Sequence, residues 1–169
     1  GRITEFEISP DGKYVAYIVK RYSLEKNKGN SEIFISTSDG KDLKQITFTT
    51  FSESVLHWHP KGKKIGFLST KSGTSQIWEI DIKGKGLRQI SFLDGDIENF
   101  MYSPTGKNIL FTMRVKTDSS AQDRYSDLPL STGRVYNDLM YRHWDSWWDF
   151  CHSHVFVAKL KKNKLSDIK

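Results

Sequence analysis

An eight-residue pattern, first seen as Phe6-Glu7-Ile8-Ser9-Pro10-Asp11-Gly12-Lys13, occurs three times in this 169-residue chain. The later copies are Leu56-His57-Trp58-His59-Pro60-Lys61-Gly62-Lys63 and Phe100-Met101-Tyr102-Ser103-Pro104-Thr105-Gly106-Lys107, at spacings of 50 and 44 residues. Pro presets φ at the first corner of a turn and Gly accepts the positive φ that closes it, so each copy predicts a hairpin. Self-similarity at this period indicates a repeat architecture.

Each copy is followed by an apolar strand, at residues 14–19, 65–68 and 109–113. A second hairpin with a glycine turn then leads to a last strand at 43–47 or 87–91, and the chain's end repeats this arrangement from Val155 to Ile168. Four short antiparallel strands per repeat are typical of one propeller blade. The alternative is a β-sandwich with accidental internal similarity. Helical periodicity is absent from all three repeats, which disfavours an all-α or α/β fold.

We therefore expect an all-β fold, an incomplete β-propeller of three four-stranded antiparallel blades with a partly helical insertion in the third. The expected boundaries are 1–50 for blade one, 51–94 for blade two and 95–169 for blade three. Closed propellers use about four to eight blades, so we expect the chain to be a segment of a longer protein.

The composition supports a folded chain. Hydrophobic residues make up 37% and aromatic residues 13%, more than disordered chains contain. Cys151 is the single cysteine, so the sequence excludes an internal disulfide and a zinc site built on several cysteines. No stretch approaches the roughly 20 apolar residues of a membrane span. The net charge of +6 includes lysines that recur beside the turns, which is ordinary for β proteins and does not predict nucleic-acid binding.

The third repeat contains an insertion. From the proline of the turn to the third strand there are 23 residues in the first repeat, 17 in the second and 51 in the third, so about 34 extra residues lie at roughly 115–154. This stretch has a net charge of −2 and holds three of the five tryptophans and three of the five histidines. Long loops on rigid scaffolds often carry function, so we look for the site here.

The densest part of the insertion runs from Asp138 to Phe150. At helical spacing its three tryptophans share one face and its three aspartates lie near one another, which predicts a short helix with an aromatic stripe beside carboxylates: Trp144, Trp147 and Trp148 with Asp138, Asp145 and Asp149. Such a surface suits a cationic group. The alternative is that the tryptophans cap the blade and pack against its neighbour.

Two motifs resemble a known family. Residues 9–17, Ser-Pro-Asp-Gly-Lys-Tyr-Val-Ala-Tyr, look like the propeller repeat of the prolyl oligopeptidase family of serine peptidases, which Tol-type propellers share. Thr132-Gly133-Arg134 and the stretch Asn137-Asp138-Leu139-Met140-Tyr141-Arg142-His143-Trp144-Asp145 are similar to an insertion in its acylaminoacyl-peptidase and dipeptidyl-peptidase branch, especially in bacterial members. The resemblance implies a propeller that covers a C-terminal α/β-hydrolase domain. That catalytic domain is absent from this chain, which contains no Gly-x-Ser-x-Gly string and no catalytic triad.

The resemblance also implies a role in selecting substrates by their N-terminus. Dipeptidyl peptidases hold the free amine of the substrate with propeller carboxylates, and by resemblance Asp145 is the first candidate, Asp149 the second, with Trp144 and Trp147 as walls and His143 beside them. The position after the aspartate is often acidic in this family and is Ser146 here. An enzyme for blocked N-termini, or one whose anchor lies elsewhere in the propeller, fits as well.

The function expected from the sequence is that of a non-catalytic propeller segment of a serine exopeptidase, which gates and helps select oligopeptides. Its expected partners are the oligopeptide substrate, the α/β-hydrolase domain and the remaining blades, with oligomer formation left open. The alternative is a non-enzymatic Tol-type propeller that binds protein partners. The resemblance implies a periplasmic or otherwise extracytoplasmic location, with the cytoplasm as the alternative. We expect no cofactor and no metal. His57 and His59 occupy the repeat positions that Glu7 and Ser9 hold in the first copy, which indicates a structural role, and no third ligand can be placed for His152 and His154.

Overall fold

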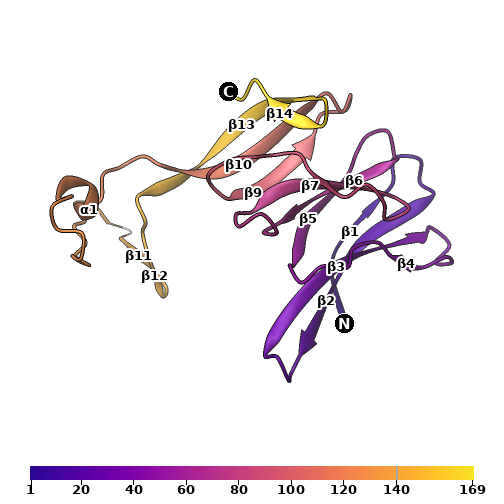
Figure 1. Cartoon of the computed structure of the whole chain (residues 1–169), viewed down its shortest axis with the longest axis horizontal. Helices are drawn as coiled ribbons and strands as arrows, with labels where there is room; N and C mark the ends of the chain where they lie inside the picture. Colours follow the sequence, from indigo (N-terminus) through magenta and orange to yellow (C-terminus); the bar gives the residue numbers. More distant parts are fainter. Residues whose placement is uncertain (140) are drawn as a thin grey trace. The chain divides into compact units, whose positions relative to one another are not determined.

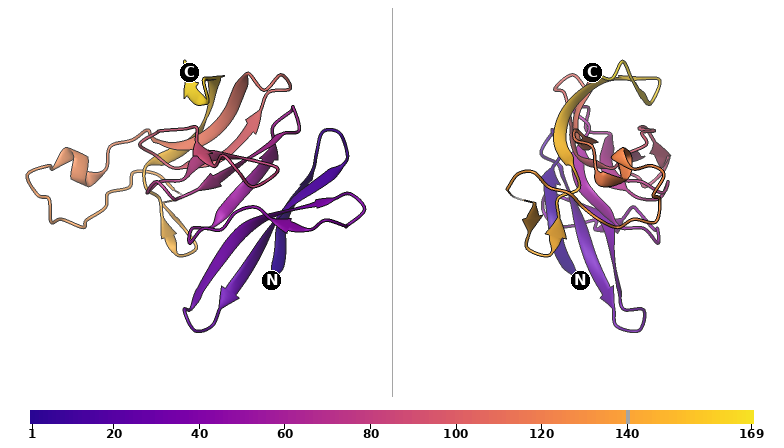
Figure 2. Two further views of the ribbon diagram at one scale, coloured as in Figure 1. Left: turned by 45° about the vertical axis from the view of Figure 1, so that its right-hand side comes forward. Right: turned by 90° about the vertical axis from the view of Figure 1, so that its left-hand side faces the viewer.

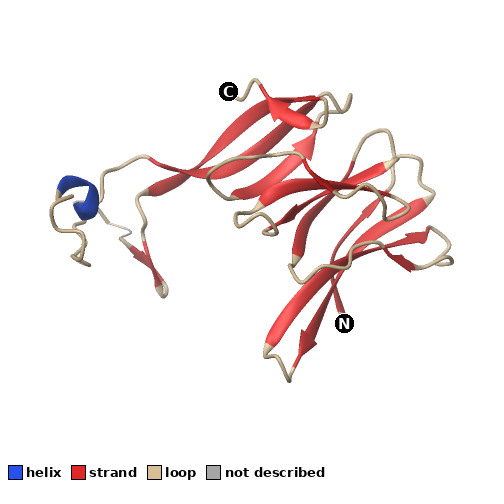
Figure 3. Ribbon diagram, in the orientation of Figure 1, coloured by secondary structure: helices blue, strands red, loops and turns tan. Residues whose placement is uncertain are grey.

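A computed structural model describes residues 1–139 and 141–169, and strands dominate it (Figure 3). The chain divides into two compact units, the first made of Gly1–Met113 and Val155–Lys169 and the second of Arg114–His154. The first unit contains three four-stranded sheets, labelled in Figure 1.

The strands of the first two sheets follow the chain order. The first sheet consists of β1 (Arg2–Ile8), β2 (Tyr14–Ser23), β3 (Lys28–Thr37) and β4 (Lys44–Gln45). The second consists of β5 (Glu53–Trp58), β6 (Lys64–Ser69), β7 (Gln76–Asp81) and β8 (Arg88–Gln89). Neighbouring strands pair antiparallel throughout both sheets. The long β2–β3 hairpin projects beyond the rest of its sheet in both views of Figure 2.

The third sheet is interrupted by the second unit. It consists of β9 (Ile97–Tyr102), β10 (Asn108–Lys116), β13 (Cys151–Lys161) and β14 (Lys164–Ser166), in the order β14-β13-β10-β9. The second unit is inserted between the neighbouring strands β10 and β13. The expected all-β fold with four-stranded antiparallel sheets is confirmed.

The repeated turns form as the sequence predicts. Their glycines have φ of 70°, 65° and 67° at Gly12, Gly62 and Gly106, the left-handed region that favours glycine. Each of these glycines donates its N–H to the carbonyl three residues earlier, at 2.8–2.9 Å. The turn therefore aligns the first and second strands of each of the three four-stranded sheets in the same way.

A buried side-chain clasp fastens the last segment of each of the first two sheets to the third strand. In the first sheet the Thr47 hydroxyl accepts the N–H of Ile33 at 2.8 Å and donates to Glu32 at 2.7 Å. In the second sheet the Ser91 hydroxyl accepts an N–H at 2.7 Å and donates to Gln76 at 2.8 Å. The clasp satisfies buried backbone groups that the two-residue strands β4 and β8 leave outside the ladder.

The core lies between the sheets. One cluster joins the first and second sheets around Ile18, Trp58 and Phe67, and the other joins the second and third sheets around Ile77, Phe100 and Phe111. Hydrogen bonds fix the alignment of neighbouring sheets. Trp58 Nε1 donates to the carbonyl of Glu7 at 2.9 Å, and the Tyr102 hydroxyl donates to the buried carboxylate of Glu79 at 2.9 Å. Each interface therefore combines apolar burial with a directional hydrogen bond.

The prediction of a helix within residues 138–150 was wrong. Arg142–His143 (β11) and Ser146–Trp147 (β12) pair antiparallel instead, with Trp144 at the turn between them at φ 53°. A positive φ is incompatible with a right-handed helix. Met140, within the same stretch, lies outside the described residues. The one helix of the described chain is α1 (Ala121–Arg124), earlier in the second unit, where Ser120 caps it.

Candidate functional site

The second unit is organised around Tyr136. Its ring stacks on Phe150 with centroids 5.4 Å apart and on Trp147 with centroids 6.0 Å apart, at interplanar angles of 7° and 10°. Its hydroxyl donates to the carbonyl of Trp148 at 2.9 Å. Phe150 is buried, and the Trp148 ring lies 5.0 Å from it. These aromatic contacts supply the small core of a unit that has little regular secondary structure.

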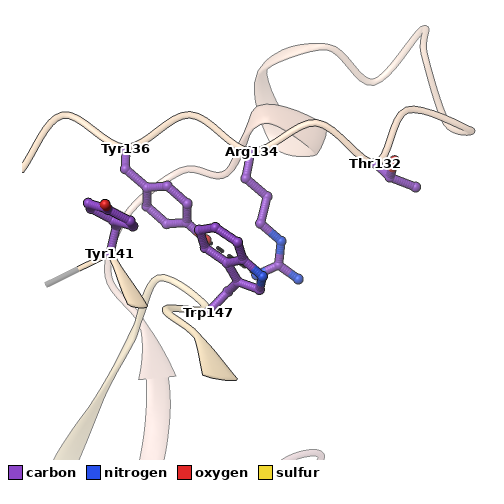
Figure 4. Close-up of a pocket in the computed structure, with 5 residues that line it drawn as sticks. All are labelled: Thr132, Arg134, Tyr136, Tyr141 and Trp147. Carbon is purple, nitrogen blue, oxygen red and sulfur yellow. Dashed lines mark hydrogen bonds between the residues drawn. The ribbon is translucent and has the colours of Figure 1, made fainter. Parts of the chain in front are cut away.

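A pocket opens beside this core (Figure 4). Its volume is about 570 Å³, and its lining residues come from the loop before Tyr136 and from the β11–β12 hairpin: Thr132, Arg134, Tyr136, Tyr141 and Trp147. The rings of Tyr136 and Tyr141 are 5.8 Å apart and those of Tyr141 and Trp147 are 6.1 Å apart. Pockets for small ligands have volumes of about 300–1,000 Å³, so the cavity is of a suitable size.

The charge at this pocket is positive. Arg134 lies in the lining, where its Nη1 donates to the Tyr136 hydroxyl and to the carbonyl of Trp148, each at 3.4 Å. The guanidinium of Arg142 lies 5.0 Å from the centroid of the Trp147 ring. Neither arginine forms an ion pair with any residue that the structure describes. A pocket with this lining favours an anion over the cation that the sequence predicts.

The structure separates the two predicted carboxylates. Asp149 is paired with Arg114 at 2.6 Å, and its Oδ1 also accepts the N–H of Cys151 at 3.2 Å. Burial raises the pKa of Asp149, but the hydrogen bonds from Arg114 and Cys151 outweigh this effect, so the pKa lies below its usual range. Asp149 is thus ionised and already neutralised by a neighbour.

Asp145 has no such partner among the described contacts. It lies in the β11–β12 turn, where the Ser146 hydroxyl donates to its Oδ1 at 3.2 Å. Beside it Trp144 is 85% exposed, and its ring makes an edge contact with His143 at 6.1 Å. None of these three lines the pocket, whereas the predicted wall residue Trp147 does. The predicted site residues therefore fall into two groups, one at the tip of the hairpin and one at the pocket.

Sequence reasoning missed Arg134, Tyr136 and Tyr141 as lining residues. Arg134 and Tyr136 are two positions apart, the spacing at which side chains of an extended segment share one side. That alternation was the sequence signal that could have identified them as neighbours in the lining. The helical pattern of the tryptophans obscured it.

The histidine pairs have structural contacts. His59 packs edge-on against Tyr102 at 5.0 Å and His57 against Phe100 at 5.2 Å. Burial lowers the pKa of His59, although the charge of Glu79 opposes the effect. In the second unit His152 contacts the Trp148 ring at 5.6 Å. Over residues 1–139 and 141–169, no group of three or more His, Cys, Asp or Glu side chains is arranged to hold a metal ion.

The TolB beta propeller domain profile matches residues 4–135, more than three quarters of the chain. The chain belongs to the TolB beta propeller domain family.

Two curated relatives of this propeller are dipeptidyl-peptidases. It is 43% identical over 157 residues to Dipeptidyl-peptidase 5 of Porphyromonas gingivalis, a match that covers 93% of the chain and 23% of the relative. It is 36% identical over 165 residues to Dipeptidyl-peptidase 5 of Porphyromonas endodontalis, covering 98% of the chain and 24% of the relative. The chain thus spans about a quarter of the length of the curated relatives it matches.

Solved structures agree on the fold. The propeller resembles the acylaminoacyl peptidase of Pyrococcus horikoshii with a TM-score of 0.72 at 17% identity, over 99% of this chain and 24% of that one. At such identity the likeness establishes the fold alone. With the curated relatives it confirms the expected resemblance to a propeller segment of a prolyl oligopeptidase-family peptidase. No helix in the described part of the chain is both long and apolar enough to cross a membrane.

Proposed function

We propose that this chain is the propeller part of a serine exopeptidase of the dipeptidyl or acylaminoacyl type, which gates access and helps select oligopeptides by their N-terminus. The observation that carries the proposal is the 43% identity to a dipeptidyl-peptidase over 93% of the chain. The catalytic triad would lie in an α/β-hydrolase domain outside this chain, and the parent protein would be a hydrolase working outside the cytoplasm. The test of location is fractionation of the native cells.

Each four-stranded sheet is one blade in this proposal, with blade boundaries at 1–50, 51–94 and 95–169 and the insertion at about 115–154. Exposed apolar side chains on the outer faces of the first and third sheets support neighbouring blades on both sides. The first sheet exposes Ile3, Phe6 and Ile8, and the third exposes Met101, Leu110, Val155 and Val157. Exposed apolar faces of this kind are typical of interaction surfaces.

The amine contact in this proposal is Asp145. Its carboxylate is exposed on the β11–β12 turn, whereas Asp149 is already paired with Arg114. Trp144, beside Asp145, offers an open aromatic face that attracts cations. A peptide amine with a pKa of about 8 is largely cationic at neutral pH, so a carboxylate and an aromatic ring together favour it.

The test compares Asp145→Asn with the parent enzyme on matched peptides with free and acetylated N-termini. We expect kcat/KM for the free peptide to fall roughly tenfold, the effect of losing about 1.4 kcal/mol, and kcat/KM for the acetylated peptide to stay unchanged. Asp127→Asn, an exposed aspartate elsewhere in the same unit, is the control and leaves both values unchanged. Equal losses on the two peptides, or no loss, would refute the amine contact.

The second candidate is a non-enzymatic propeller that binds protein partners, favoured by the match to the TolB beta propeller domain. The gene sequence downstream of Lys169 separates the two. A Gly-x-Ser-x-Gly nucleophile elbow within the following several hundred residues supports the peptidase. Its absence there supports the binding protein.

A further inference from the structure

We infer that the pocket formed by Arg134, Tyr136, Tyr141 and Trp147 binds a carboxylate carried next to an apolar or aromatic group. This inference rests on the proposed function only in taking the ligand to be a peptide. The carboxylate would come from the C-terminus of a short peptide or from an acidic side chain. It adds a second recognition point to the proposed amine contact.

The first argument is the state of Arg134. Its Nη1 donates to two neutral acceptors, the Tyr136 hydroxyl and the carbonyl of Trp148, through long and therefore weak hydrogen bonds of 3.4 Å. The guanidinium has five N–H donors, and no carboxylate among the described residues accepts from them. A planar guanidinium that is oriented but not neutralised is suited to a carboxylate, which it can bind through two parallel hydrogen bonds.

The second argument is the contrast within the same unit. Two other basic side chains of the unit form ion pairs, Arg114 with Asp149 and Lys116 with Asp123. The unit has an excess of acidic residues, yet Arg134, like Arg124 and Arg142, forms no ion pair with any described residue. The positive charge at the pocket is therefore a local feature, reinforced by the Arg142 guanidinium over the Trp147 ring at 5.0 Å.

The third argument is the aromatic wall. Three rings with centroids 5.8–6.1 Å apart line the cavity beside the guanidinium (Figure 4). Trp147 is 46% exposed and Tyr141 44%, so part of each side chain is open to a ligand. Tyr136, by contrast, is fixed by its hydrogen bond to Trp148 and its stacking on Phe150. A rigid ring at the back and exposed rings at the mouth favour an apolar group beside the charged one.

The test measures binding of three short peptides to the full-length protein, treated with phenylmethylsulfonyl fluoride so that bound peptides stay intact. The probes are acetyl-Ala-Phe with a free carboxylate, the same peptide as the C-terminal amide, and acetyl-Glu-Phe-amide. All three lack a free amine, so the proposed contact at Asp145 does not contribute. Calorimetry at pH 7 gives the ratio of their dissociation constants.

In the wild-type protein we expect acetyl-Ala-Phe to bind roughly tenfold tighter than its amide, because the charged acceptor strengthens the hydrogen bonds to Arg134. Arg134→Gln should bring this ratio to about one, and Arg134→Lys should restore part of it. The control Arg124→Gln, which removes an arginine outside the pocket lining, should leave the ratio unchanged. Trp147→Leu should weaken acid and amide alike.

The third probe identifies the source of the carboxylate. Tight binding of acetyl-Glu-Phe-amide shows that a side-chain carboxylate occupies the pocket, and binding no tighter than that of the Ala-Phe amide assigns the pocket to the peptide C-terminus. Equal binding of all three probes to the wild type, or an equal loss of the carboxylate preference in Arg134→Gln and Arg124→Gln, overturns the inference. If the preference holds in a protein that hydrolyses no peptide, the proposed function fails and the pocket stands. If peptides are hydrolysed but no preference exists, only the pocket inference fails.

Discussion

Glu53, the first residue of β5, is a buried carboxylic acid that keeps its proton at neutral pH, which costs stability there, and replacing it should stabilise the fold at neutral pH. Its side chain is 2% exposed. The Thr49 hydroxyl donates to it at 2.8 Å, and the Thr47 hydroxyl, which donates to Glu32 at 2.7 Å, lies 3.4 Å from the Glu53 carboxyl group. Burial raises the pKa of Glu53 to about 8, with a contribution from the charge of Glu32 and against the hydroxyl hydrogen bonds.

The sign of the pH dependence follows from proton binding. Between the ordinary glutamate pKa of 4.5 and about 8 the folded chain keeps a proton on Glu53 that the unfolded chain releases. The free energy of unfolding therefore falls as pH rises through this window, by at most about 1.4 kcal/mol per pH unit. From pH 5 to pH 7 the loss amounts to roughly 2 kcal/mol. Above pH 8 both states are ionised and the decline ends.

Glu53→Gln removes this titration, because the amide does not carry the proton. It keeps the hydrogen bonds of the site, since the amide oxygen still accepts from Thr49 and the amide nitrogen donates to Glu32 in place of the proton. We expect the variant to match the wild type near pH 4.5 and to exceed it by roughly 3 kcal/mol at pH 7.

Urea unfolding followed by tryptophan fluorescence at pH 5, 6, 7 and 8 measures the difference. His59, whose pKa is lowered by burial, contributes equally to both proteins and cancels. Glu25→Gln, an exposed glutamate in the β2–β3 turn, is the control and keeps the wild-type pH dependence. An unchanged slope in Glu53→Gln would refute the assigned proton.

Two further predictions concern the packing of the sheets and the insertion. Gly66→Ala places a Cβ against the hydroxyl of Tyr102, so we expect a loss of about 1–3 kcal/mol in urea unfolding, whereas Gly133→Ala, whose Cβ would make only an ordinary contact with the Ser131 hydroxyl at 3.6 Å, should cost less than about 1 kcal/mol. An equal effect of the two would contradict the close approach. Arg114→Gln removes the charge beside Asp149 and leaves burial less opposed, so the pKa of Asp149 should rise in a carbon-detected NMR titration, and a constant value would argue against the ion pair.

The sequence predicted the sheets because their signals are local and repeated. A proline, a glycine at positive φ and a following apolar strand recur three times, and each glycine closes the same turn in the structure: Gly12, Gly62 and Gly106. The clasp that pairs Glu32 with Thr47, and Gln76 with Ser91, was missed because its two partners lie 15 residues apart, so the pattern within either segment alone does not reveal the hydrogen bond.

The candidate site was predicted less well, for a physical reason. Tryptophans at 144, 147 and 148 satisfy helical spacing, but a stretch this short forms the secondary structure that its surroundings stabilise. Here Trp148 donates its N–H to the carbonyl of Tyr141 at 2.9 Å, which extends the hairpin instead. Hairpin geometry then brings Tyr141 and Trp147 to the pocket and leaves Trp144 and Asp145 at the tip.

The place where the second unit enters the chain has an evolutionary consequence. Both ends of Arg114–His154 continue neighbouring, paired strands, β10 and β13, at a position where the second sheet needs only the short connection between β6 and β7. The rings that stabilise the unit, those of Tyr136, Trp148 and Phe150, all belong to the unit itself. Surface residues of the unit can accordingly be exchanged, and its loops lengthened or shortened, without repacking the sheets. Ligand preference can therefore diverge among related propellers while the scaffold stays constant.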